Sequence, residues 1–569
     1  MRRLAPWAAA ALGAALVLWV FWPGYMSWDS AYQWWQARNN QFDSVHPPLL
    51  AMIWQLSDRV VEGPGGMLAL QVLLLWSALA LFASALRLPA AGRAFVVLFL
   101  GLWPPLLAMQ PHIWKDLWTL AGFTWALALL AQDLRAPHRG WRAGAVLALV
   151  FACAFRHNAI TGALPLLAWI GWREVAGYAP AWTARRRVLP TGVIALVLAV
   201  AVFVLAALPA QDGRVRHTER VWSVVTLWDA AAVSLAEGRL VYPPELVDPT
   251  LTLDELRQHF TDYSNTTIYV TGKLRHSFDA PYSPEQRAAI DALVLALPRD
   301  HTAAYLAHRA RLAQLLFGWD RAALPDGQVM MAGLHAYGDN PPVAPQAHPQ
   351  HARVLATLQA LIDSPFFAGW IYLLACVGVA LAGAMRANRS PGAGLAATVA
   401  LSSLAYALPL ALASGSAEFR YLAWPVLATL ASALLLPFPG PGFVSIGRNH
   451  PGEDHAPTAA RHRPRRRALR PRCRAGARCR GARRQRRRQG AGLAPRHPPA
   501  SRAGQPRGAH REAGGRPPAR ARLRGHPHRR RHHRRHRPAA RRQARPAHRP
   551  ARRHGRAAGH RTQRPALRV

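Results

Sequence analysis

The chain has 569 residues, 51% of them hydrophobic, and a formal net charge of +43. Forty of its 71 basic residues are arginines after position 445, in a segment with 3 of the 28 acidic residues, so residues 1 to 445 carry a net charge of only +6. The strong positive charge is therefore confined to the C-terminal segment and is not a property of the whole chain. The chain has only four cysteines, which excludes a disulfide-rich framework.

Repeated apolar stretches before residue 440 approach the roughly 20 residues that a helix needs to cross about 30 Å of hydrocarbon. They predict an all-α, polytopic transmembrane helix bundle of about ten spans. The stretches at 143–155 and 159–172 are short and flank a polar hinge, so one of them is alternatively a re-entrant segment or a buried core helix. The expected spans are 5–22, 66–86, 94–110, 116–132, 143–155, 159–172, 188–208, 367–385, 393–413 and 421–437.

Arginines in short loops predict the orientation, because basic residues are retained on the cytoplasmic side of a membrane. With the N-terminus inside, five arginine clusters fall on the inner side. We therefore expect a multi-pass membrane protein with both termini in the cytoplasm. The clusters are Arg2 and Arg3; Arg87 and Arg93; Arg135, Arg139 and Arg142; Arg173, Arg185, Arg186 and Arg187; and Arg386 and Arg389.

The same alternation divides the chain into four parts. Residues 1–209 are expected to form an N-terminal transmembrane bundle, and 210–365 a mainly helical extracytoplasmic domain. Residues 366–440 supply the C-terminal transmembrane helices, and 441–569 form an arginine-rich tail.

Within 210–365, helix signals are clear. Thr252-Leu253-Asp254-Glu255 and Ser283-Pro284-Glu285-Gln286 are typical of helix starts, and Gly318 is expected to end a helix that begins near residue 302. Residues 263–270 are expected to form a short strand or an extended loop. The helix before Gly318 is expected to bury Leu306, Leu312, Leu315 and Leu316 and to direct His308, Arg309 and Arg311 elsewhere or towards lipid headgroups.

The tail has no Phe, Trp, Tyr or Lys after residue 445. Such a composition cannot bury a core and predicts disorder. One interpretation is a polybasic segment on the cytoplasmic leaflet. We favour an out-of-frame translation of GC-rich DNA, because Arg, Ala, Gly and Pro have GC-rich codons. No nucleic-acid partner is expected, since no aromatic residues are interleaved with the arginines.

Polar residues at the outer ends of the spans form the candidate site. An ionisable group at the bilayer centre costs about 2.5 to 3.5 kcal/mol, so such groups near span ends face water or a wet cavity. A single cation there is more often an interfacial anchor, and Trp28, Trp34, Trp35, Trp114 and Trp118 are typical of an aromatic belt. Carboxylates contribute little to topology, so acids beside cations indicate a site. The candidates are Asp29, Asp43, His46, His112, Lys115, Asp116, Arg156, His157, Asn158, Glu418, Arg420 and Tyr421, with Asp229, Tyr242 and Lys273 as further members.

Five short motifs in residues 1 to about 440 carry a resemblance. They follow or connect the expected spans and share one side of the membrane. Together they resemble a bacterial branch of the C-type glycosyltransferases, integral-membrane enzymes that use polyprenyl-phosphate sugars. The motifs are Trp28-Asp29-Ser30, Asp43-Ser44-Val45-His46-Pro47-Pro48, Lys115-Asp116, Arg156-His157-Asn158 and Arg420-Tyr421.

The resemblance implies inverting transfer of a hexosyl or pentosyl group from a polyprenyl-phosphate sugar to a cell-envelope glycan, lipid or protein acceptor at the outer face of the bacterial cytoplasmic (inner) membrane. Asp29 would then be the base, with Asp43 and His46 in the catalytic group and His112 as an alternative partner in proton transfer. Lys115, Arg156 and Arg420 would hold the phosphate, and Arg suits bidentate contact. The remaining substrate-binding candidates are Asp116, His157, Asn158, Glu418 and Tyr421.

The first loop departs from the family pattern. Members often carry an acidic pair there, whereas Asp29 precedes Ser30 and the next acid is Asp43. The base and any metal requirement therefore stay open. No cofactor is expected, and a divalent cation on His46, His112 and His157 with an aspartate is the alternative.

Two other functions remain. The chain is alternatively a transporter or flippase of a lipid-linked or anionic substrate, or a noncatalytic membrane protein. The sequence shows no internal repeat and no matched pair of Gly/Pro-broken helices, which are features that would favour transport. An enzyme predicts Asp29 in one cavity with Lys115, Arg156 and Arg420, whereas a carrier predicts polar residues that continue through the bundle.

Overall fold

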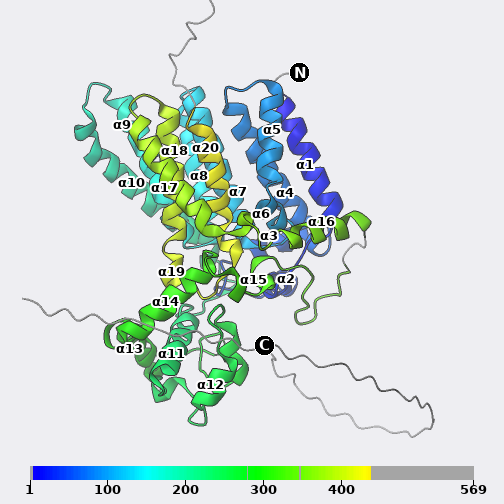
Figure 1. Cartoon of the computed structure of the whole chain (residues 1–569), viewed down its shortest axis with the longest axis vertical. Helices are drawn as coiled ribbons and strands as arrows, with labels where there is room; N and C mark the ends of the chain where they lie inside the picture. The colour runs from blue at the N-terminus through cyan, green and yellow to red at the C-terminus, as the bar shows by residue number, and fades with distance from the viewer. Residues whose placement is uncertain (1–3, 279, 345–347, 438–569) are drawn as a thin grey trace, which may run out of the picture. The chain divides into compact units, whose positions relative to one another are not determined.

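The structure of the chain, a computed structural model, describes residues 4–278, 280–344 and 348–437. These residues are mainly helical and contain two short strands (Figure 1), so the predicted helical fold is confirmed. The predictions for the tail at 441–569, its disorder and its origin from another reading frame, concern residues outside the described part of the chain.

Five helices in the described part of the chain are long and apolar enough to cross a membrane. Shorter apolar helices accompany them, so the membrane character is supported, while the count of about ten spans stays a prediction. The five are α4 (Pro64–Ala85), α7 (Lys115–Arg135), α10 (Ala184–Ala207) with its extension η1 (Leu208–Gln211), α17 (Gly369–Arg386), and α18 (Pro391–Ala407) continued by α19 (Leu410–Ala413). The shorter ones are α1 (Ala5–Phe21), α5 (Ala90–Gly101), and η6 (Phe419–Leu422) continued by α20 (Ala423–Leu435).

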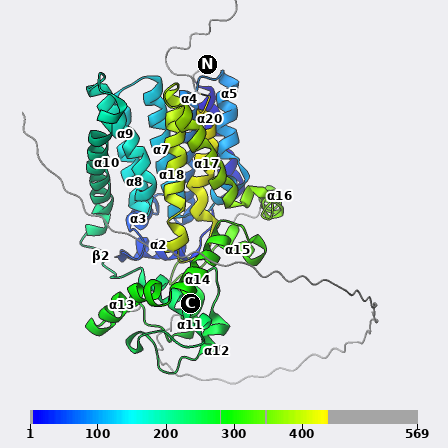
Figure 2. The same ribbon diagram turned by 60° about the vertical axis from the view of Figure 1, so that its left-hand side comes forward.

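Helix α7 is central to the bundle. It packs against α4 on one side and α8 (Arg139–Phe155) on another, while α18 packs against α9 (Ala159–Tyr178), α17 and α20 (Figures 1 and 2). A Cβ atom on Gly122 of α7 would lie 2.8 Å from the Cβ of Ala152 in α8. Lipid tails are as apolar as leucine, so close approach at small residues, rather than escape from water, holds such helices together.

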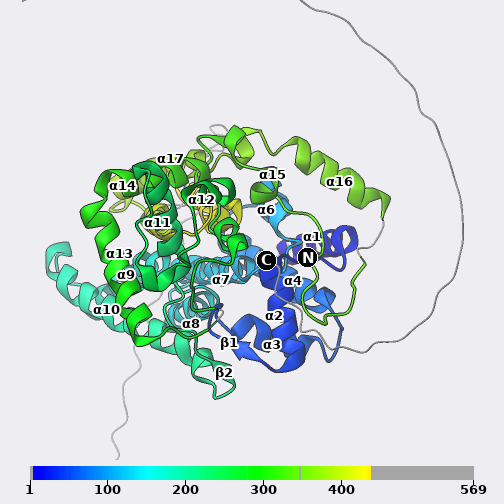
Figure 3. The same cartoon turned by 90° about the horizontal axis from the view of Figure 1, so that it is seen from below.

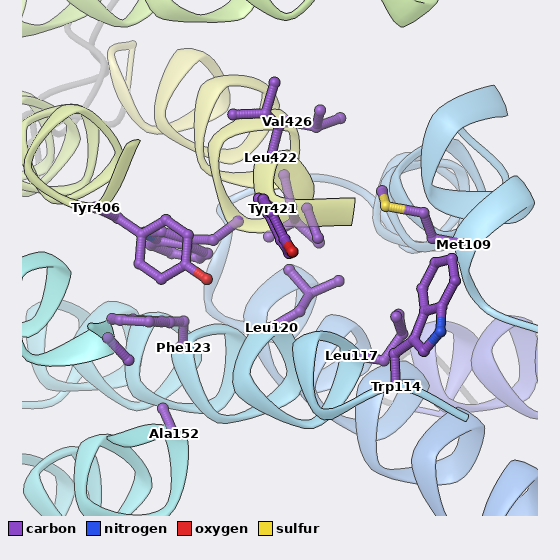
Figure 4. Packing of buried hydrophobic residues seen from close by; sticks show 14 of the residues in the cluster. Met109, Trp114, Leu117, Leu120, Phe123, Ala152, Tyr406, Tyr421, Leu422 and Val426 are labelled. Atoms are coloured by element: carbon purple, nitrogen blue, oxygen red, sulfur yellow. The ribbon is translucent and has the colours of Figure 1, made fainter. Parts of the chain in front are cut away.

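The centre of the bundle is apolar. Leu117, Leu120 and Phe123 of α7 lie opposite Tyr421 and Leu422 at the start of the last helix (Figure 4). Phe123 stacks on Trp424, with ring centroids 4.8 Å apart and planes inclined by 15°. The helix that begins at Lys115 is thereby fixed against the segment that carries Arg420.

The 210–365 segment is built around α11 (Ser223–Glu237). This helix packs on α12 (Leu253–His259), α13 (Pro284–Asp300) and α14 (Thr302–Leu316). Thr252 accepts a hydrogen bond from the amide of Glu255, and Ser283 forms a reciprocal capping box with Gln286. Gly318, at φ +73°, follows the end of α14. The predicted helix starts and stop are confirmed.

One expectation for this segment is correct only in part, since α14 buries Leu312, Leu315 and Leu316 as predicted but not Leu306, and a second expectation is wrong. The buried face of α14 includes His308 and Arg309, whose exposed fractions are 7% and 2%, whereas Leu306 is 51% exposed. The cause is Asp229 of α11, which faces α14 and binds both basic side chains. Residues 266–271 form the 3-10 helix η3 (Thr266–Thr271) rather than a strand.

Short elements connect the bundle to this segment. Strand β1 (Phe42–Asp43) pairs in parallel with β2 (Val215–Arg216), which joins the first loop to the start of the 210–365 segment (Figure 3). The remaining elements are α2 (Trp28–Asn39), α3 (Leu49–Ser57), α6 (Pro104–Met109), η2 (Pro244–Leu246), η4 (Arg321–Ala323), α15 (Asp326–Val329), α16 (Pro349–Ala360) and η5 (Pro365–Phe367).

Candidate functional site

Backbone pairing holds the first loop against the turn before α7. Tyr25 donates its amide to the carbonyl of Pro111 at 2.8 Å, and Ile113 donates its amide to the carbonyl of Tyr25 at 3.0 Å. The hydroxyl of Ser30 donates to the carbonyl of Ile113 at 2.6 Å. The N-terminus of α2 therefore lies beside the N-terminus of α7.

Ser27 completes this arrangement. Its hydroxyl accepts from the amide of Ser30 at 3.4 Å and so caps α2, and it also accepts from the indole N–H of Trp114 at 3.0 Å. Asp29, in the first turn of α2, is thereby placed near Lys115, the first residue of α7.

One large cavity, of about 1680 Å³, lies at these helix ends. Predicted site residues from five separate stretches of the chain line it. The predicted residues that line the large cavity are Asp29, Asp43, His46, Lys115, Arg156, His157, Asn158, Asp229, Glu418, Arg420 and Tyr421.

Arg420 joins two carboxylates at this cavity. Its Nη2 lies 3.0 Å from Oδ2 of Asp29, and its Nε lies 2.6 Å from Oε2 of Glu418. The guanidinium also lies over the ring of Trp114, 4.8 Å from the centroid. The side chain of Arg420 is 8% exposed and that of Asp29 is 31% exposed, so the carboxylate is the more accessible member of the pair.

His46 lies between Asp29 and Lys115. Nζ of Lys115 is 2.6 Å from Nδ1 of His46, and Nε2 of His46 is 3.6 Å from Oδ1 of Asp29. An ammonium group can only donate, so Nδ1 accepts and the neutral ring carries its proton on Nε2. That proton faces the Asp29 carboxylate.

Charge and burial set the protonation states of these two groups. Burial raises the pKa of Asp29, but the positive charge of Arg420, the contact with His46 and the positive charge of Lys115 together outweigh burial and hold the pKa well below its usual range. Burial and the Lys115 charge lower the pKa of His46 despite the opposing effect of Asp29. The resting site therefore pairs an ionised Asp29 with a neutral His46.

Arg156 is held by a residue outside the lining of the large cavity. It donates through Nη1 to Asp116, whose side chain is 1% exposed. The Arg156 guanidinium lies 4.4 Å from the centroid of the Tyr421 ring. Burial disfavours the charged form of Arg156, but Asp116 raises the pKa above its ordinary value. Asp116 therefore orients Arg156, which lines the large cavity, without lining the cavity itself.

Asp43 and His112 are occupied within the protein. Asp43 accepts from the hydroxyl of Tyr32 and, at 3.1 Å, from the amide of Val45, and its side chain is 4% exposed. His112 is outside the cavity lining, with its ring nitrogens facing the carbonyls of Met109 and Met331. Burial lowers the pKa of His112 to about 4.

Of the three further candidates, Asp229, Tyr242 and Lys273, only Asp229 lines the large cavity. Asp229 lines the large cavity together with Arg309, which binds it. Tyr242 instead donates to the carbonyl of Leu227, and Lys273 pairs with Glu255 at 2.5 Å, so neither lines the cavity.

One wall of the large cavity is aromatic and was not predicted from the sequence. Trp28, Tyr32 and Trp35 lie at helical spacing on one face of α2 and line the large cavity with Tyr337. Tyr32 and Trp35 stack at 6.2 Å, and Tyr337 lies 5.9 Å from Trp28 and from Trp35. The i, i+4, i+7 spacing was the available signal, whereas the contribution of Tyr337 required tertiary structure.

Within the described residues, no group of three or more His, Cys, Asp or Glu side chains is arranged to hold a metal ion. Comparisons with family models, with curated proteins and with solved structures gave no match to this chain.

Proposed function

We propose that the chain is a membrane glycosyltransferase that moves a sugar from a polyprenyl phosphate to an acceptor hydroxyl. The observation that carries the proposal is the Asp29 carboxylate, flanked by Arg420 and by the His46–Lys115 pair on the wall of the large cavity. A base beside several buried cations suits a reaction in which a hydroxyl loses a proton while a phosphate leaves.

The proposed reaction is a single displacement. Asp29 takes the proton of the acceptor hydroxyl as its oxygen forms a bond to the anomeric carbon. The bond from that carbon to the phosphate oxygen breaks on the opposite face, so the configuration inverts, and the polyprenyl phosphate leaves with the bonding electrons. Lys115, Arg156 and Arg420 stabilise its negative charge.

Arg420 couples substrate binding to the base. In the resting site it pairs with Asp29, which keeps the carboxylate ionised but weakly basic. A donor phosphate competes for the same guanidinium, because Arg forms bidentate contacts with phosphate oxygens. Withdrawal of Arg420 towards the phosphate would then raise the basicity of Asp29 when the donor is bound.

The remaining walls suit the two ends of such a donor. The aromatic wall of Trp28, Tyr32, Trp35 and Tyr337 offers flat surfaces for the apolar face of a sugar ring. Leu412, at the end of a helix long enough to cross a membrane, also lines the cavity and is 59% exposed. An exposed apolar residue at this position suits entry of a lipid chain from the bilayer.

The topology belongs to the same proposal. About ten crossings, with both termini in the cytoplasm, would place the large cavity at the outer face of a bacterial cytoplasmic membrane. The apolar packing of Leu117, Leu120 and Phe123 beyond the cavity favours an enzyme over a carrier, which needs a polar route through the bundle (Figure 4).

The experiment uses full-length protein in proteoliposomes with a panel of synthetic polyprenyl-phosphate hexoses and pentoses and an envelope extract as acceptor. Mass spectrometry follows release of polyprenyl phosphate. We expect release by the wild type, its loss in Asp29→Ala, and retention in the control Asp254→Ala, which changes a carboxylate that is 93% exposed. Full release by a normally inserted Asp29→Ala variant would overturn the proposal, as would movement of uncleaved donor between leaflets.

A further inference from the structure

A second cavity, of about 490 Å³, lies at the opposite end of α7 from Lys115. At about 1.5 Å per residue, the 21 residues of α7 span roughly 30 Å, the thickness of a hydrocarbon core. Four of the residues that line this cavity are His138, Arg139, Arg142 and Arg173, and none of its lining residues is acidic. We call this cavity the arginine pocket.

Two acids orient the arginines of the pocket. Asp133, with a side chain 0% exposed, lies 3.2 Å from Nε of Arg173 and 3.9 Å from Nη1 of Arg142. Glu174 lies 2.8 Å from Nε of Arg142 and 3.6 Å from Nε of Arg139. Most of these contacts are made through Nε, so they fix the orientation of the guanidinium groups.

The terminal nitrogens of Arg173 remain available for a ligand. In the described residues, Arg173 forms a hydrogen bond through Nε alone, to Asp133, and its side chain is 22% exposed. A fixed guanidinium with free terminal N–H groups is suited to bidentate contact with phosphate oxygens. A Cβ added to Gly177, which also lines the pocket, would meet nothing within 4 Å, so space is left beside the arginines.

We propose that the arginine pocket binds a phosphate group, carried by the headgroup of an anionic phospholipid or free in solution. Basic pockets between transmembrane helices on the cytoplasmic side suit anionic headgroups. The volume suits a small polar headgroup. The site is separate from the large cavity and stands whether or not the chain is a transferase.

Native mass spectrometry of the full-length protein in detergent tests the proposal with phosphatidylglycerol, phosphatidylethanolamine and inorganic phosphate as probes. We expect phosphatidylglycerol to bind more tightly than phosphatidylethanolamine, and Arg142→Gln/Arg173→Gln to weaken it about thirtyfold. The matched control is Arg185→Gln/Arg186→Gln, which removes the same charge from exposed positions and should change the affinity less than about threefold.

A second variant guards against misfolding, because the double substitution leaves Asp133 buried without its partners. Gly177→Leu retains every ion pair and fills the space, so it should also weaken phosphatidylglycerol binding. Binding of inorganic phosphate with no preference for phosphatidylglycerol would assign the pocket to the free ion. The proposal is wrong if Gly177→Leu and the double variant bind both probes as tightly as the wild type does.

Discussion

Arg420 and Asp29 are 391 positions apart in the chain, and their side chains meet with Nη2 3.0 Å from Oδ2. The contact joins the start of α2 to the segment before α20. Because Arg420 also holds Glu418, one guanidinium serves two carboxylates of the large cavity, and Asp29, at 31% exposed, is more accessible than Glu418, at 23%. This geometry makes Arg420 the group through which the charge of a bound phosphate would act on Asp29.

Arg420→Lys should lower kcat/KM for the polyprenyl-phosphate donor by about 10²- to 10³-fold, because a lysine keeps the charge but loses the fork that contacts Asp29, Glu418 and phosphate together. Steady-state kinetics in proteoliposomes would measure the loss. Arg38→Lys is the control, since Arg38 lies outside the cavity lining and pairs with Asp339 at 4.0 Å. Unchanged kinetics in Arg420→Lys would exclude a bidentate role.

Trp28→Ala should raise the KM for the donor by about tenfold with a smaller change in kcat, because the indole forms part of the aromatic wall and carries no group that takes a proton or holds the phosphate. Trp28 is 50% exposed, so its removal should leave the fold intact. The matched control is Trp319→Ala, which removes an indole that is 64% exposed and outside the cavity lining. Equal KM values for the two variants would rule out ring stacking on this wall.

Much of the site was predictable because membrane insertion restricts polar groups. Hydropathy and arginine placement put Asp29, Lys115, Arg156 and Arg420 on one predicted side of the spans, and helix packing then brings them to one cavity. The motifs needed no tertiary information for this, since each lies within a few residues of a predicted span end.

Individual partners were not predictable from the sequence. Asp43 lines the large cavity but accepts from Tyr32, and Asp116 lies behind Arg156, so two carboxylates predicted for the site are occupied by partners within the protein. Trp34, which was assigned to an aromatic belt, is fully buried and donates to Asp58 at 3.0 Å. Such contacts depend on which helix faces which, and a periodicity does not encode that choice.

Acidification should destabilise the protein between about pH 6.5 and about pH 4. Burial lowers the pKa of His112 from near 6.5 to about 4, so within this range the unfolded chain binds a proton that the folded chain excludes. Stability is therefore present above the unfolded pKa and is lost as the pH falls, by on the order of 3 kcal/mol. The lowered pKa of His46 acts in the same direction, and the lowered pKa of Asp29 extends the loss to more acidic pH.

Thermal unfolding in nanodiscs at a series of pH values would measure this slope. His112→Asn should flatten it, whatever its effect on absolute stability, because asparagine does not titrate. His217→Asn, at an exposed position, should leave the slope unchanged. An equally steep dependence in His112→Asn would show that other groups cause the acid loss.

Asp229→Ala should reduce the free energy of unfolding by about 3 to 5 kcal/mol, since it leaves Arg309 buried and without its carboxylate partner. Asp229→Leu/Arg309→Met should cost much less, because it removes both charges and leaves apolar side chains. Denaturant unfolding, with limited proteolysis of the 210–365 segment, would measure both. Asp254→Ala, which breaks an exposed pair with Arg257, is the control and should have no measurable effect.

The same substitutions separate stability from positioning. Nη1 of Arg309 donates to the carbonyl of Ser414 at 2.7 Å, in the turn that leads to Glu418 and Arg420. If this contact positions the turn, the double variant should fold yet lose donor turnover, and it should show a faster rate of amide hydrogen exchange at residues 414–420. Full turnover in a stable double variant would mean that the Arg309–Asp229 pair stabilises the 210–365 segment without positioning Arg420.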